Sequence, residues 1–123
     1  MNIFRWLSLI LFPFFISCGK PLPHIEGVDL VRWEADKNGC DNIRLSMRDA
    51  IDKEKEKLLS LDQIQIVELL GRPDQNELSE RNQKFFHYFI EPSGSCKGDR
   101  IHNPARLVIR FNALGLAKEV AIE

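Results

Sequence analysis

The stretch LDQIQIVELLGRPD, residues 61–74, decides how this chain folds, because it encodes a short helix with both ends specified. Asp62 is placed to cap the N-terminus, and Gln65, three residues later, completes a capping box. Gly71 suits a left-handed C-terminal stop, and Pro73 prevents the helix from resuming. A helix of about two turns is too short to be stable alone. We therefore expect it to pack on a sheet, which the downstream sequence supplies.

A longer helix is expected upstream, from Asp41 to about Leu59, where apolar residues recur at helical spacing. These apolar residues are Ile43, Met47, Ala50, Ile51 and Leu58. Residues 28–33, VDLVRW, fit either one helical turn or an extended piece. We expect Val31 and Trp33 to cover part of the core. The alternative is that Trp33 is an exposed aromatic anchor for a partner.

The period changes from helical to alternating after Pro73, which predicts an antiparallel sheet. Residues 83–90, 105–112 and 116–122 are expected to form its three strands, and the polar residues 75–81 to contribute at most a short edge strand. The strand residues expected to face the core are Phe86, Tyr88, Ile90, Leu107, Ile109, Phe111, Leu116, Val120 and Ile122. The predicted fold class is α+β, with two helices packed on one face of a three-stranded antiparallel sheet.

The first seventeen residues have the pattern of a secretory signal, with a basic start, an apolar run over residues 7–16 and a small residue before Cys18. That run is shorter than the roughly 20 residues that span a bilayer, so a retained membrane anchor is the weaker alternative. The sequence FISC, ending at Cys18, resembles the lipobox of bacterial lipoproteins, although Phe15 stands where leucine is usual. An ordinary cleaved signal is the other alternative.

The resemblance implies that Cys18 carries lipid and becomes the mature N-terminus. Gly19 is not the aspartate that holds some lipoproteins in the inner membrane, so we expect an outer-membrane anchor. No acidic cluster of the kind that resembles a surface-export signal follows Cys18, so we expect the periplasmic side. Two or more acyl chains are enough for stable anchoring. The predicted organisation is a signal peptide over residues 1–17, a lipidated N-terminus and linker over 18–27, and one domain over 28–123.

Two cysteines remain once Cys18 is assigned to lipid. Export implies an oxidising compartment, in which Cys40 and Cys96 are expected to form a disulfide. The alternatives are a zinc site, for which no second cysteine lies at ligand spacing, and a catalytic thiol, which needs an unpaired cysteine.

The charges are balanced, with 17 Lys and Arg against 18 Asp and Glu, so nothing draws the chain toward nucleic acid. The sequence contains no glycine-rich phosphate loop, and its three histidines are scattered. We therefore expect no enzymatic activity, no cofactor and no metal. A small-ligand binder or enzyme that uses Asp99, Arg100 and His102 in the 91–104 loop is kept as an alternative.

The helix with its Gly-x-Pro ending, after a lipobox and before the predicted strands, resembles the SmpA/OmlA (BamE-like) family of outer-membrane lipoproteins. The resemblance covers roughly residues 41–123, and a group of Bacteroidetes lipoproteins is similar around Trp33 and Cys40. It implies a fold shared with β-lactamase inhibitor proteins. It also implies a small protein-binding or scaffolding role in outer-membrane protein assembly or maintenance. The chain departs from the family in its N-terminal segment, its longer first helix and its cysteine pair.

Partner binding is therefore the expected function, with another envelope protein as the partner. Residues on the second face of the strand at 83–90 are aromatic, which predicts either partial cover or an interaction surface. The candidate partner-binding residues are Trp33, Phe85, Phe89, Arg100 and His102. The alternative in this class is an inhibitor-type module that enters the cleft of a periplasmic enzyme with the aromatic face or the 91–104 loop.

Overall fold

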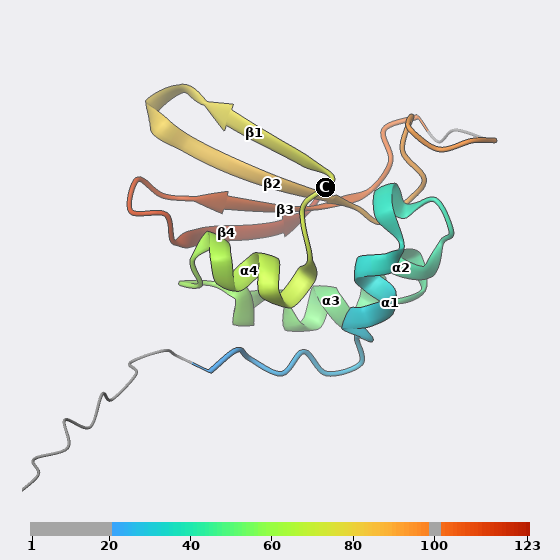
Figure 1. Ribbon diagram of the computed structural model, residues 1–123, viewed down its shortest axis with the longest axis horizontal. Helices are drawn as coiled ribbons and strands as arrows, with labels where there is room; N and C mark the ends of the chain where they lie inside the picture. The colour runs from blue at the N-terminus through green and yellow to red at the C-terminus, as the bar shows by residue number, and fades with distance from the viewer. Residues whose placement is uncertain (1–20, 99–101) are drawn as a thin grey trace, which may run out of the picture.

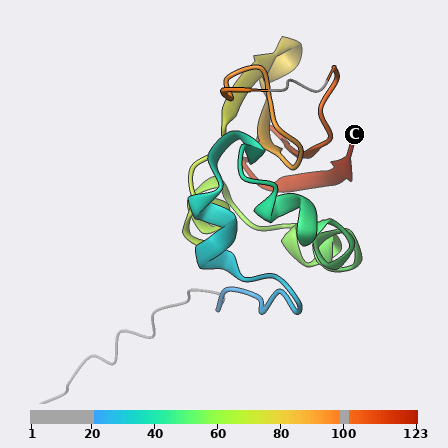
Figure 2. The ribbon, with the colours of Figure 1, turned by 90° about the vertical axis from the view of Figure 1, so that its right-hand side faces the viewer.

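The computed structural model describes residues 21–98 and 102–123 and shows an α+β fold. A four-stranded antiparallel sheet has the order β1-β2-β3-β4, and α1 to α4 lie together on one of its faces (Figures 1 and 2). The strands are β1 Gln75–Ser79, β2 Gln83–Phe89, β3 Arg106–Phe111 and β4 Ala117–Ile122. The α-helices are α1 Leu30–Ala35, α2 Ile43–Ser46, α3 Arg48–Glu54 and α4 Gln63–Leu70. Short 3-10 turns are η1 Lys37–Gly39, η2 Lys55–Leu58 and η3 Glu80–Asn82.

The α+β class is confirmed, but the prediction of three strands is wrong. The polar segment after Pro73 forms β1, a full partner of β2 over five residue pairs. All five β1 residues are exposed, so the sequence lacks the alternation of apolar and polar residues that predicts a strand. Backbone pairing with β2 forms this strand without burial of its side chains.

The short helix predicted within residues 61–74 is confirmed as α4, with both of its predicted ends. The Asp62 carboxylate accepts from the Gln65 backbone N–H at 2.8 Å, and the Gln65 side chain accepts from the Asp62 N–H at 3.0 Å. Gly71 ends the helix at φ +81°, where a Cβ would lie 2.6 Å from a side-chain carbon of Glu34. Gly71 therefore serves both the backbone conformation and the close approach of α1.

The predicted continuous helix from Asp41 to Leu59 is wrong, because the chain breaks it into α2, α3 and η2. Met47 leaves the helical conformation between α2 and α3, and its sulfur accepts from the Asp29 backbone N–H at 3.3 Å. The ion pairs Asp52–Lys55 and Glu54–Lys57 join residues three apart, from the end of α3 to η2. Side chains at that spacing align in a 3-10 turn.

The core fills the space between the helices and the sheet. Trp33, Ile51 and Leu58 from the helical layer are fully buried, as are Tyr88 and Leu107 from the sheet. The predicted apolar stripe therefore survives the break in the helix. Val31 is 79% exposed, so its predicted place in the core is wrong. Ile25 is buried in the same core, which extends into the predicted linker.

A β-bulge corrects one further prediction, the inward position of Leu116. Arg110 pairs with Glu119 but Phe111 pairs with Ala117, so one β4 residue, Lys118, has no partner. The extra residue shifts the alternation of side chains by one position. Ala117 is consequently buried in the core, and Leu116 is exposed.

The predicted disulfide between Cys40 and Cys96 is present, with the two Cα atoms 5.5 Å apart. It joins the turn after η1 to the loop that follows β2. None of the helices in the described part of the chain is long and apolar enough to cross a membrane.

Candidate functional site

The face of the sheet opposite the helices is the candidate site, and no helix of residues 21–98 and 102–123 covers it (Figure 1). We call it the open face. Strand register arranges its side chains in three rows that cross the sheet. The rows are Glu77, Phe85, Arg110 and Glu119; then Gln75, His87, Val108 and Ala121; then Phe89, Arg106 and Glu123.

Charge on the open face follows the strands. The arginines stand on the inner strand β3, and carboxylates stand on both outer strands. Arg110 lies 3.1 Å from Glu119, and Arg106 lies 3.8 Å from Glu123. These pairs are partly exposed, and exposed ion pairs contribute only about 0.2–1 kcal/mol. The charges therefore remain available to a partner with complementary groups.

His87 lies at the centre of the open face and is only 4% exposed. Its Nε2 lies 3.0 Å from a carboxylate oxygen of Glu77, and its ring is stacked 6.4 Å from that of Phe85. Its Nδ1 has no hydrogen-bond partner among the described residues. An unpaired buried polar atom costs about 1–3 kcal/mol. Packing alone would be better served by an apolar side chain, so we count His87 among the candidate recognition residues.

The two candidate phenylalanines differ in accessibility. Phe85 is partly exposed in the first row, whereas Phe89 is only 6% exposed. Phe89 lies beside a hollow of about 250 Å³ that is also lined by Pro104 and Arg106, where the 91–104 loop returns to the sheet. Phe85 is therefore the aromatic side chain that the open face presents, and Phe89 forms the floor at one end.

The other candidate residues do not join this site. Trp33 is fully buried, with its ring centroid 6.4 Å from that of Tyr88, so its proposed role as an exposed anchor is wrong. His102 is exposed in the loop. Arg100 and the lipidation residue Cys18 lie outside the described residues.

A buried arginine holds the ends of β1 and β2 together with the helical layer. Arg44 is 1% exposed and donates to an Asp74 carboxylate oxygen at 2.6 Å, to the Phe89 carbonyl at 3.1 Å and to the Trp33 carbonyl at 2.8 Å. Asp74 also accepts from the backbone N–H groups of Asn38 and Phe89. Removing one partner of such a buried pair costs about 3–5 kcal/mol, because the other charge is left unpaired. This cluster fixes the geometry of the open face from beneath.

Tyr88 is the second tie between the layers. Its hydroxyl donates to the Gly71 carbonyl at the end of α4, at 2.8 Å. Burial raises the pKa of Tyr88 well above its usual value, and the neighbouring Arg44 partly opposes that rise. Tyr88 thus stays protonated and keeps this hydrogen bond at neutral pH.

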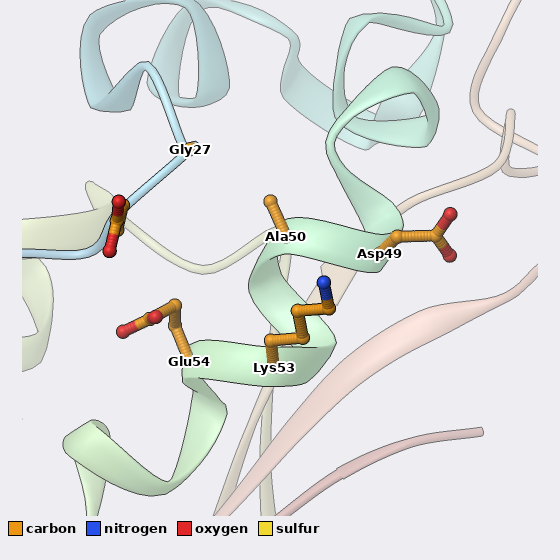
Figure 3. A pocket seen from close by; sticks show the side chains of 6 residues that line it. Gly27, Asp49, Ala50, Lys53 and Glu54 are labelled. Atoms are coloured by element: carbon orange, nitrogen blue, oxygen red, sulfur yellow. The ribbon is translucent and has the colours of Figure 1, made fainter.

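A larger hollow, of about 410 Å³, lies on the opposite side of the molecule, where the N-terminal segment crosses α3 (Figure 3). Ala50 points toward Gly27 in this hollow, and a Cβ on Gly27 would approach that of Ala50 to 3.1 Å. Asp49 and Glu54 point to different sides of it. Since the carboxylates do not converge, this hollow is a packing feature of the N-terminal segment.

Sequence reasoning missed most members of the three rows. Alternation places Arg106, Val108 and Arg110 opposite the core residues of β3, and this signal was in the sequence. The partners of these residues on β1 and β4 depend on register and on the bulge, which the sequence does not disclose. As a charged residue in a predicted helix, Arg44 would be expected on the surface, and nothing in the sequence predicts its burial.

Neither a family model, nor a curated protein, nor a solved structure matches this chain.

Proposed function

We propose that this protein is a non-catalytic lipoprotein of the outer membrane, anchored through lipid on Cys18, that binds another envelope protein through its open face. The observation that carries the binding role is the first row, in which the partly exposed Phe85 stands between Glu77 and Arg110. The anchor is supported by the lipobox-like sequence that ends at Cys18. The resemblance of the sequence to BamE-like lipoproteins supports a role in outer-membrane protein assembly or maintenance.

The chemistry of the open face suits a protein partner. Aromatic and arginine side chains are enriched in the energetic centres of protein interfaces. Here they are carried on paired strands, so their positions are set before binding and little ordering is needed on association. Acidic edges around a basic middle favour one orientation of a complementary surface.

Site-specific photo-crosslinking in intact cells tests this proposal. A photoreactive amino acid at position 85 samples the open face, and one at Val31, which is 79% exposed on α1, samples the helical side as a control. We expect a discrete crosslinked band from position 85 and none from position 31. Mass spectrometry of the band identifies the partner. Equal crosslinking from both positions, or none from position 85, would count against the open face.

The anchor is tested separately by Cys18→Ser. We expect this variant to lose metabolic labelling with a palmitate analogue and to leave the membrane fraction. The open-face crosslink should then weaken, because the partner is met at the membrane. Retained labelling of the Cys18→Ser variant would refute the lipid assignment.

A further inference from the structure

The two edges of the sheet are not alike. The outer edge of β4 is occupied where the strand begins, because the Ser60 N–H donates to the Ala117 carbonyl and the Ala117 N–H donates to the Leu61 carbonyl, both at 2.8 Å. The bulge at Lys118 then interrupts that edge. Bulges and lysine are devices that block further strand pairing.

The outer edge of β1 has none of these devices. Among residues 21–98 and 102–123, β1 pairs with β2 alone, in unbroken register from Gln75 to Ser79, and it contains neither proline nor lysine. Its Leu78 is 74% exposed on the helix side of the sheet, the side of its partner Lys84. A regular edge strand with an exposed apolar residue is a template for pairing with another chain.

Glu77 decides what can pair there. It lies at the centre of β1, and its side chain is 62% exposed on the open-face side. In an antiparallel pair of two β1 strands centred on this residue, Glu77 would face Glu77 of the second copy. Like charges directly opposite each other destabilise a strand pair. A strand with a basic residue opposite Glu77 and an apolar residue beside Leu78 fits both requirements.

We propose that β1 adds an extended segment of a partner protein as a fifth strand, with alternating basic and apolar residues, the basic ones on the open-face side. The inference rests on the proposed function, because it names the kind of segment that an envelope partner presents to this protein. Main-chain hydrogen bonds supply affinity in such strand addition, and alternate side chains supply specificity.

The test uses the full-length chain in detergent micelles and two heptapeptides, Thr-Val-Lys-Val-Lys-Val-Thr and the same sequence with glutamate in place of lysine. We expect the lysine peptide to slow hydrogen exchange of the β1 amides, from Gln75 to Ser79. We expect it to bind about two- to five-fold more tightly than the glutamate peptide, the size of one cross-strand charge pair.

Two exposed positions provide the variants, so the fold is kept. Glu77→Lys should reverse the preference between the peptides, and Leu78→Lys should weaken binding of both. Failure of the lysine peptide to protect β1, or unchanged affinities of the two peptides for Glu77→Lys, would overturn the inference. Dimerisation of the chain that Leu78→Lys abolishes would overturn it in favour of a second copy as the occupant. The crosslink at position 85 is independent of these outcomes, so the proposed function and this inference fail separately.

Discussion

Phe85 and Phe86 are adjacent residues of one strand, and they have opposite surroundings. Phe86 is 3% exposed and packs edge-on against Phe111, with ring centroids 4.7 Å apart. Phe85 stands on the open face between charged residues and is partly exposed. The same type of side chain therefore fills the core on one side of the sheet and remains partly accessible to solvent on the other.

The polar groups of the two sides differ in the same way. On the helix side, the Arg44 and Asp74 side chains are buried and bond to each other and to the backbone, although the Trp33 indole N–H has no partner among the described residues. On the open face, Arg110 and Glu119 form a partly exposed pair, and a nitrogen of His87 has no partner among the described residues. A satisfied buried cluster specifies one arrangement, whereas partly used groups leave capacity for binding.

Truncating the two phenylalanines tests this comparison most directly. We expect Phe86→Ala to lower the free energy of unfolding by about 3–5 kcal/mol, because it leaves a cavity in the core. Phe85→Ala should lower it by about 1 kcal/mol or less, since that side chain is partly exposed. Urea unfolding followed by circular dichroism measures both. Similar losses for the two variants would mean that the open face is covered in solution.

Removing the disulfide tests how much of the stability comes from packing of the helices on the sheet without the covalent bond. The bond joins residues 56 apart in sequence. Replacing Cys40 and Cys96 together with serine should lower the free energy of unfolding by about 2–4 kcal/mol, chiefly through the added entropy of the unfolded chain. Wild-type protein treated with a thiol reductant should show the same loss. Unchanged stability in both samples would contradict the bond.

Alkaline titration sharpens the comparison at a single buried group. Tyr88 is the only tyrosine in the chain, so tyrosinate absorbance reports on it alone. Its pKa is raised by burial, so the stability it provides is complete below about pH 10, the unfolded value, and is lost as the pH rises further. We expect tyrosinate to appear together with unfolding, not before it.

The matched variant is Tyr88→Phe. It leaves the Gly71 carbonyl without its donor, which should cost about 1–2 kcal/mol at neutral pH. It should also reduce the loss of stability above about pH 10. Ionisation of Tyr88 at its ordinary pKa in the folded protein would show that the hydroxyl is open to solvent.

Much of the fold was predictable because its signals are local. The caps of α4 depend on Asp62, Gln65 and Gly71, which act within one or two turns of chain. Alternation identified β2 and β3, and the cysteine pair followed from the number of cysteines and the predicted export signal. Each of these inferences needs only neighbouring residues or the compartment that the N-terminal sequence predicts.

The remainder depended on contacts between distant segments. β1 is polar except for the exposed Leu78, and it is a strand only because β2 lies beside it. The exposure of Leu116 follows from the β-bulge in β4, which no turn residue in the sequence predicts. The break at Met47 is accompanied by a contact of its sulfur with Asp29, and the buried Arg44 is paired with Asp74. Both partners are distant in the sequence.

The sequence by itself therefore determined the fold class, the ends of the α4 helix, the inward residues of two strands and the cysteine pairing. Only the tertiary structure decided which side chains share the open face and which edge of the sheet is free. The physical reason is that capping and alternation act over a few residues, whereas register and edge protection are properties of paired strands and exist only once the sheet has formed.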